Sequence, residues 1–110
     1  MKKYEIVKSN IAFNEIINKG KKVSNSFFTI FYIENNQDKA KFGVTVPKRI
    51  GKAVIRNLLK RQTREIISKT KFLFKNNRNY IIIVKEKCLK ETFSNKMEAL
   101  KKLIGEANEK

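Results

Sequence analysis

The sequence predicts an α+β fold, in which helices pack against a small β-sheet. The chain has 110 residues, of which 41% are hydrophobic, and this suits one compact domain with its own core. Apolar residues recur with helical and strand periods in the order helix, two or three strands, helix, strand, helix. With three strands in the first group, we expect a single-domain α-β-β-β-α-β-α sandwich over residues 1–110.

The first half of the chain predicts one helix and a long apolar strand. Ser9-Asn10 can cap a helix that runs to about residue 18, with Gly20 as its stop signal. The run from Val23 to Ile33 is rich in Phe, Thr, Ile and Tyr, which favour a strand. Its side chains alternate between two faces, one with Phe28, Ile30 and Tyr32 and the other with Phe27, Thr29, Phe31 and Ile33. Because both faces are largely apolar, we expect the strand to be covered on both sides or to bind something with one face.

The second half supplies two strands and two helices. Lys41 to Val46 alternates apolar and polar side chains, which predicts a half-exposed strand that Pro47 ends. The remaining elements are a helix from about 53 to 69, a strand over 79–85 and a helix from about 92 to 104 that stops at Gly105. Polar stretches at 34–39 and 75–79 predict loops.

A strong positive charge indicates the class of partner. Lys and Arg number 26 against 10 Asp and Glu, which gives a formal net charge of +16 and a pI near 10.1. Residues 39–75 contain 12 basic residues and Glu65 as the one acid. Such a concentration attracts polyanions, and nucleic acid is the first candidate.

Several chemical classes are excluded by residue types that are absent or single. The chain contains no His, so catalysis by Ser-His-Asp or Cys-His groups and zinc binding through His are excluded. Cys88 is the one cysteine and is expected to be a small buried residue, compatible with a reducing cytoplasm. The apolar runs are too short for a membrane span, and no secretion signal is expected after Lys2 and Lys3, so no membrane partner is expected.

The predicted helix over 53–69 carries a basic stripe. At about 100° per residue, its polar side chains fall within roughly 140° of the helix circumference; they are Arg56, Asn57, Lys60, Arg61 and Arg64. The opposite side, expected to face the core, holds Ile55, Leu58, Leu59, Gln62 and Ile66. Like charges four residues apart destabilise a helix. Their presence here therefore favours polyanion binding over a merely solvated face.

The stripe lies in a segment that resembles a known family. Residues 41–65, KFGVTVPKRIGKAVIRNLLKRQTRE, are similar to the signature of the bacterial ribonuclease P protein subunit. The matching positions are Gly51, Ala53, Val54, Arg56, Asn57, Lys60, Arg61 and Arg64. FNEIINKGKKVSNSFFTIFY resembles the family's first helix and strand, and RNYIIIVKEKC its last strand, so the resemblance covers about residues 8–104. It implies a fold similar to the second domain of ribosomal protein S5, with an uncommon left-handed crossover.

The resemblance also implies a function. Members of the family are the protein component of an endoribonuclease in which a catalytic RNA removes the 5′ leader from precursor tRNA. RNA and Mg²⁺ perform the hydrolysis, so the protein is not catalytic alone, and neither catalytic nor metal-binding side chains are expected in it. The implied partners are the ribonuclease P RNA and precursor tRNA in the cytoplasm, and no obligate protein partner is expected.

Two RNA-binding surfaces follow from the resemblance. The contacts to the catalytic RNA are expected from Lys48, Arg49, Lys52, Arg56, Asn57, Lys60, Arg61 and Arg64. The leader is expected to contact Phe13 and Phe31, together with Ile17, which stands where the family often has a second aromatic residue. From the residues alone, Phe13 and Phe31 could instead belong to the core.

Two other functions remain open on the sequence. One is a different RNA-binding module, such as a ribosomal or single-strand RNA-binding protein with the same basic helix. The other is a protein-only nuclease that uses Asp or Glu with a metal ion, for which the central segment offers only Glu65.

Overall fold

The computed structural model describes residues 6–7 and 10–109 and shows the predicted α+β order. The elements are α1 (Asn10–Lys19), β1 (Lys21–Ser24), β2 (Phe28–Glu34), β3 (Lys41–Thr45), η2 (Lys48–Ile50), α2 (Ala53–Lys69), η3 (Lys71–Leu73), β4 (Arg78–Val84), η4 (Glu86–Leu89) and α3 (Phe93–Glu109). The α-β-β-β-α-β-α order is therefore confirmed, with three additional single turns of 3₁₀ helix, η2, η3 and η4.

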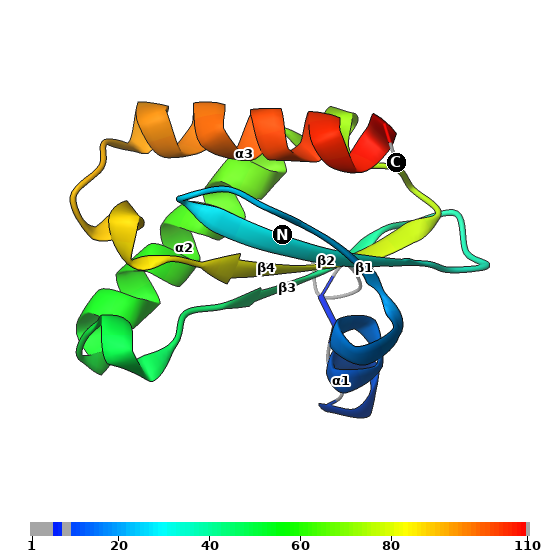
Figure 1. Ribbon diagram of the computed structural model, residues 1–110, viewed down its shortest axis with the longest axis horizontal. Helices are drawn as coiled ribbons and strands as arrows, with labels where there is room; N and C mark the ends of the chain where they lie inside the picture. Colours follow the sequence, from blue (N-terminus) through cyan, green and yellow to red (C-terminus); the bar gives the residue numbers. More distant parts are fainter. Residues whose placement is uncertain (1–5, 8–9, 110) are drawn as a thin grey trace.

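The four strands form one mixed sheet in the order β1-β2-β4-β3. β2 is antiparallel to both β1 and β4, whereas β3 is parallel to β4 and is joined to it through α2. Figure 1 shows α1 on one face of the sheet, while α2 and α3 lie on the other. This β3-α2-β4 connection is the crossover for which the family resemblance implies a left-handed turn.

The core lies between the sheet and the pair α2 and α3. Along β2, Phe28, Ile30 and Tyr32 are buried on this side, while the alternate residues Thr29, Phe31 and Ile33 are half-buried. The ring of Tyr80 stacks on Phe42 at 5.7 Å between centroids, and Phe74 meets Tyr80 edge-on at 4.9 Å. Aromatic pairs at these distances pack favourably and add to the burial of their area.

The predicted strand over 23–33 is wrong in one respect, because a turn divides it. The side-chain oxygen of Asn25 accepts hydrogen bonds from the backbone N–H groups of Phe27 and Phe28, at 2.9 and 2.8 Å. Its amide donates to the Ala99 carbonyl of α3 at 3.0 Å. Such local bonding by Asn competes with the strand ladder. Phe27 therefore leaves the face that it was predicted to share with Phe31 and packs against the core instead.

The predicted end of the last helix at Gly105 is also wrong. α3 continues through Gly105 to Glu109. Its final turn is held by Arg78, whose Nη1 donates to the Ala107 carbonyl at 3.2 Å, and by Asn108, whose amide donates to the Leu73 carbonyl at 2.8 Å. Ala107 itself is fully buried. These contacts outweigh the roughly 1 kcal/mol by which glycine disfavours a helix interior.

β3 differs from the half-exposed strand that was predicted. Its second face is partly covered, because Gly43 is buried and faces the ring of Phe13 in α1. A Cβ at Gly43 would lie 2.7 Å from Cδ1 of Ile81 and 3.4 Å from Cε2 of Phe13. The missing side chain thus allows α1 to approach the sheet.

One smaller expectation concerns Cys88. Cys88 is 1% exposed, as expected of a small buried residue. Within residues 6–7 and 10–109, no helix combines the length and the apolar character that crossing a membrane requires.

Candidate nucleic-acid interface

α2 has the predicted bounds but a different orientation. Its buried residues are Leu59, Thr63, Ile66 and Ile67. The centre of this set is rotated by roughly 70° from the side predicted to face the core. Thr63 can face inward because its hydroxyl donates to the Leu59 carbonyl at 2.8 Å, which satisfies the buried polar group. Of the predicted core side, Ile55 and Leu58 are instead 40% and 42% exposed.

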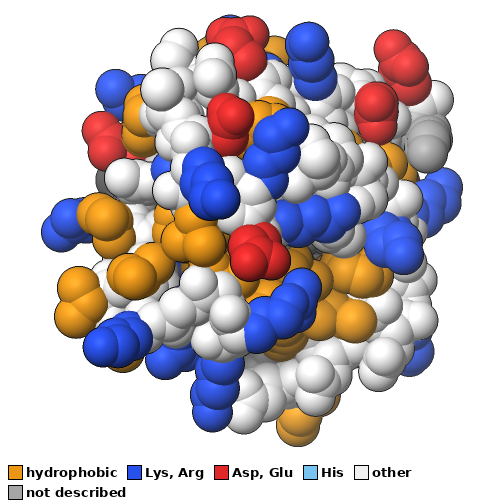
Figure 2. Space-filling model, turned by 60° about the vertical axis from the view of Figure 1, so that its left-hand side comes forward, with side chains coloured by type: hydrophobic (Ala, Val, Ile, Leu, Met, Phe, Trp, Pro, Cys, Tyr) orange, Lys and Arg blue, Asp and Glu red, His pale blue; other side chains and the backbone are white. Residues whose placement is uncertain are grey.

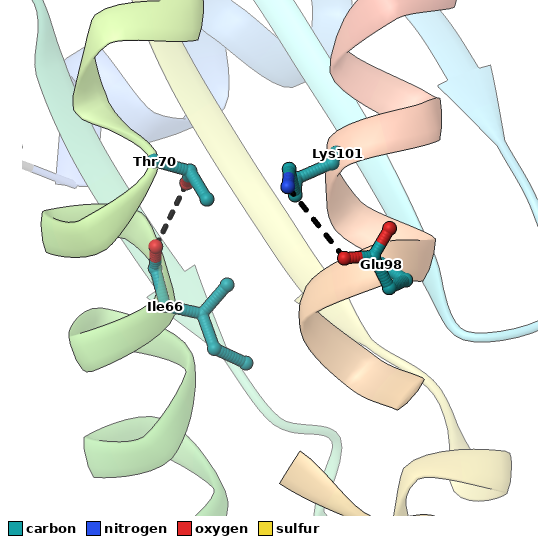
Figure 3. Close-up of polar contacts among 4 residues, drawn as sticks. All are labelled: Ile66, Thr70, Glu98 and Lys101. Carbon is teal, nitrogen blue, oxygen red and sulfur yellow. Dashed lines mark hydrogen bonds and ion pairs between the residues drawn. The ribbon is translucent and has the colours of Figure 1, made fainter. Parts of the chain in front are cut away.

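The end of α2 is fixed by a residue that faces the core. The hydroxyl of Thr70 donates to the Ile66 carbonyl at 2.7 Å (Figure 3). The backbone N–H of Thr70 donates to the same carbonyl at 3.0 Å. Across from this end, α3 carries an ion pair between Lys101 and Glu98 at 3.5 Å (Figure 3). The buried Thr70 thus closes the carboxyl end of α2, whereas the side chains from Lys52 to Ile55 at its amino end are exposed.

The rotation of α2 divides the basic stripe into two parts. Asn57, Arg61 and Arg64 are exposed, whereas Arg56 and Lys60 are half-buried at the edge of the packed face. Arg56 is fixed by a bond from its Nε to the Gly51 carbonyl at 3.1 Å. One part of the stripe therefore lies beside the packed face of α2, where Arg56 contacts the turn before the helix. The other part lies on the solvent side of the helix.

The segment before α2 extends the same surface. Ile50 is buried in η2, and Lys48, Arg49 and Lys52 around it are exposed. Together with the stripe they form what we call the basic surface, which consists of Lys48, Arg49, Lys52, Arg56, Asn57, Lys60, Arg61 and Arg64. All eight predicted RNA contacts thus lie within one continuous stretch, residues 48–64, which comprises η2, the link to α2 and the first twelve residues of α2.

The cations of the basic surface are available to a ligand. In the part of the chain that the structure describes, none of them forms an ion pair, and the one pair on α2 joins Glu65 and Lys69 at 3.8 Å. Figure 2 shows Lys and Arg side chains spread over the side of the molecule where α2 begins, with hydrophobic side chains between them. Uncompensated cations of this kind are suited to phosphate groups.

A groove runs beside this surface. Ile6 pairs with Phe42 at the outer edge of β3, and the N–H of Val7 donates to the Phe42 carbonyl at 3.0 Å. Between this segment and α2 lies a groove of about 530 Å³ lined by Ile6, Arg61, Arg64, Glu65 and Ser68. Two predicted RNA contacts, Arg61 and Arg64, thus line a concave surface.

The three predicted leader contacts gather on the opposite face of the sheet. Phe13 and Ile17 are half-buried on α1, on either side of the buried Ile16. Phe31 is half-buried in β2 and pairs in register with Ile81, which in turn pairs with Gly43 beneath Phe13. Phe13 and Phe31 therefore lie over the same row of the sheet, and neither is fully enclosed. We call the face that they share with Ile17 the α1 face.

The α1 face includes residues that the sequence prediction did not assign to a site. Thr29, Ile83 and Thr45 are paired in register one row along from Phe31, and all three are half-buried. Alternation within β2 places Thr29 beside Phe31, but only the pairing of the strands brings Ile83 and Thr45 there.

A polar network borders this row. Nζ of Lys85 donates to Oγ of Ser24 and to the Asn25 carbonyl, each at 2.6 Å. Oγ of Ser24 lies 3.0 Å from Oγ1 of Thr29. The ammonium group of Lys85 is thereby held beside the half-buried row that contains Thr29.

Burial raises the pKa of two groups outside these surfaces, Cys88 and Tyr80. Desolvation raises the pKa of Cys88 to about 11, and its thiol donates to the Phe27 carbonyl at 3.3 Å. Burial likewise raises the pKa of Tyr80. Among the described residues, no group of three or more His, Cys, Asp or Glu lies together in a way that could hold a metal ion. The chemistry that the two surfaces offer is binding, through cations on one and aromatic and aliphatic faces on the other.

Comparison with known proteins identifies the family. The family model described as Ribonuclease P matches residues 1–108. The chain belongs to the ribonuclease P protein family. Ribonuclease P is an endoribonuclease made of RNA and protein, and this family is its protein component.

Relatives match nearly the whole chain. The ribonuclease P protein component of Mycoplasma mycoides subsp. mycoides is 38% identical over 107 residues, which are 96% of this chain and 98% of the relative. The corresponding protein of Bacillus pumilus is 33% identical over 105 residues, with 94% and 88% covered.

Solved structures of ribonuclease P proteins share the fold. The Staphylococcus aureus protein superposes with a TM-score of 0.85 at 28% identity, over 94% of each chain. The Thermotoga maritima protein gives 0.84 at 28% identity, over 91% of this chain and 94% of its own. Residues 51–64, which resemble the family's signature, lie in the turn before α2 and along the first two thirds of this helix.

Proposed function

We propose that the chain binds the ribonuclease P RNA through the basic surface and the 5′ leader of precursor tRNA on the α1 face. It thereby promotes the endonucleolytic removal of the leader that gives the mature tRNA 5′ end. The observation that carries this proposal is the pair of surfaces on opposite sides of one sheet, one cationic and one with half-exposed aromatic rings. Both RNAs are cytoplasmic in this proposal.

The basic surface supports binding to a folded RNA through its phosphates. Arginine has a planar group that makes paired hydrogen bonds to phosphate, and four of the five Arg in the chain lie between residues 49 and 64. Asn57, exposed among them, can donate to and accept from a ribose or a base edge. The fixed position of Arg56 favours a defined RNA geometry over loose attraction.

The α1 face supports binding to a single strand. Exposed parts of Phe13 and Phe31 can stack on unpaired bases of any sequence, and Ile17 can add an aliphatic contact. Because both rings lie over the same row of the sheet, they can contact a single RNA strand together. Binding without base preference suits leaders that differ from one tRNA to another.

In this proposal the chemistry belongs to the RNA. Mg²⁺, bound mainly by the catalytic RNA, would supply the metal-ion chemistry of the hydrolysis. The protein's residues hold the RNA and the leader in place, and its positive charge offsets repulsion between the two polyanions.

The decisive experiment is multiple-turnover cleavage of a precursor tRNA by its cognate ribonuclease P RNA, with and without the protein, at low Mg²⁺ and near-physiological salt. We expect efficient cleavage only when both are present. The variant Lys102→Ala loses an exposed cation of α3 that lies outside both surfaces. It should promote cleavage as well as the unsubstituted protein does.

Two results would contradict the proposal. If the folded protein binds RNA but leaves cleavage unchanged, it is a different RNA-binding module. If the protein alone cleaves RNA in a metal-dependent reaction, it is a protein-only nuclease.

A further inference from the structure

Three aliphatic side chains at the start of α2 are exposed to solvent. Val54 is 80% exposed, Leu58 42% and Ile55 40%. They lie on the first two turns, ahead of Leu59, the first residue of α2 that is buried. Large apolar side chains grouped on a surface indicate a binding site more often than isolated ones do.

The geometry of the helix places two of these residues in line with a cation of the basic surface. Val54, Leu58 and Arg61 are separated by four and then three residues, so they lie along one ridge of α2. Ile55 is turned aside, and its Cγ2 lies 3.3 Å from the position that a Cβ on Gly51 would take. Val54 and Leu58 therefore form a small apolar surface that continues directly into Arg61.

The charges around this apolar surface decide what can occupy it. Lys52 precedes it, Arg61 follows it and Asn57 lies between the two aliphatic residues in sequence. All three are exposed, and within the described residues neither cation has an acidic partner. A second copy of a chain with a net charge of +16 would be repelled from this place. An RNA strand meets both conditions, because its bases have apolar faces and its phosphates are anionic.

We propose that Val54 and Leu58 contact the face of an unpaired nucleobase of the ribonuclease P RNA, while Arg61 binds an adjacent phosphate. The site thus takes a flipped or looped base rather than a continuous duplex, whose base faces are covered by stacking. This inference rests on the proposed function and deepens it, since it assigns an apolar component to a surface that is otherwise electrostatic.

The test uses the double variant Val54→Thr/Leu58→Gln, which keeps side chains of similar size and makes them polar. Binding of the cognate ribonuclease P RNA is measured over a series of salt concentrations. We expect the double variant to bind about 5- to 20-fold more weakly, at the lower end of what one stacked base contributes. The dependence of binding on salt should not change, because no phosphate contact is lost. Arg61→Ala, by contrast, should lower that dependence.

Phe72→Gln is the matched control. Phe72 is 79% exposed in η3, beyond the other end of α2, and its substitution also replaces an exposed apolar group by a polar one. This variant should bind the RNA like the unsubstituted protein. Urea unfolding should show that the double variant remains folded, since Val54 is largely exposed and Leu58 is only partly packed.

The outcomes separate the inference from the proposed function. Unchanged RNA binding by the double variant, or an equal loss in the Phe72 control, refutes the base contact alone. So does sedimentation that shows RNA-free self-association of the unsubstituted chain and its loss in the double variant. If the unsubstituted protein neither binds the RNA nor promotes cleavage, the proposed function itself fails.

Discussion

Substitution of Gly20 by alanine should destabilise the protein and loosen the α1 face at the same time. Gly20 links α1 to β1, and its N–H donates to the Ile16 carbonyl at 2.9 Å. A Cβ at this position would lie 2.4 Å from the Ile16 carbonyl oxygen and 2.6 Å from the Tyr32 carbonyl oxygen. Both atoms belong to the backbone, so neither can move aside without shifting α1 or β2.

The expected magnitude follows from these distances. The nearest contact is shorter by about 1 Å than the 3.4 Å at which ordinary van der Waals contact begins. Overpacking of this kind costs about 1–3 kcal/mol, and weakening of the bond to Ile16 adds about 1 kcal/mol. We therefore expect Gly20→Ala to lower the free energy of unfolding by about 2–4 kcal/mol. At about 4 °C per kcal/mol, the melting temperature should fall by roughly 8–16 °C.

Gly105→Ala provides a control of the same chemistry with the opposite sign. Gly105 lies inside α3, and a Cβ there would have no heavy atom within 4 Å. Alanine restricts the unfolded chain and favours the helix, so it should raise the free energy of unfolding by about 0.5–1 kcal/mol. Urea unfolding followed by circular dichroism measures both variants.

The same variants connect stability with binding. Since α1 carries Phe13 and Ile17, Gly20→Ala should weaken binding of leader-bearing precursor tRNA more than binding of the ribonuclease P RNA. A Gly20→Ala variant as stable as the unsubstituted chain would refute the reasoning about close approach. A destabilising Gly105→Ala would show that α3 does not continue through that residue.

Three further predictions concern the two surfaces and the core. Arg61→Ala should weaken binding of the ribonuclease P RNA by about 1–3 kcal/mol and lower the salt slope by about one unit or less, and an unchanged slope in a salt titration would contradict a direct phosphate contact. Phe31→Ala should weaken binding of leader-bearing precursor by about 1–3 kcal/mol and spare mature tRNA, whereas equal losses would assign Phe31 a role in packing alone. Burial raises the pKa of Cys88 from its ordinary 9.0 to about 11. Between these two pH values the thiol is deprotonated in the unfolded chain but stays protonated in the folded protein. The free energy of unfolding should therefore fall as pH rises through this range. Urea unfolding of the protein and of Cys88→Ala at several pH values in this range measures the effect. If the free energies of unfolding of the two proteins change in parallel with pH, Cys88 is not the cause.

The elements of the fold were largely predictable because they depend on local patterns. The bounds of α2 agree with its apolar period, and the order of helices and strands agrees with the sequence of periods. Where the prediction was wrong, contacts between distant residues override local preference. Asn25 turns the chain within an apolar run while it bonds to Ala99, and the last turn of α3 is held by Arg78.

The candidate site was predictable in composition but not in arrangement. The eight residues of the basic surface are close in sequence, so one helix and the turn before it necessarily bring them together. Phe13 and Phe31 come from different elements, and their placement over one row depends on strand register and on the open position at Gly43.

The sequence by itself determined the element order, the concentration of charge and the identity of the cationic helix, since all three depend on residues near one another in the chain. Only the tertiary structure decided which way α2 faces. A helical period gives the angles between side chains but not the direction of the core, which is set by the sheet and α3. That direction buries Thr63 and Ile67 and leaves Val54 and Leu58 exposed beside Arg61.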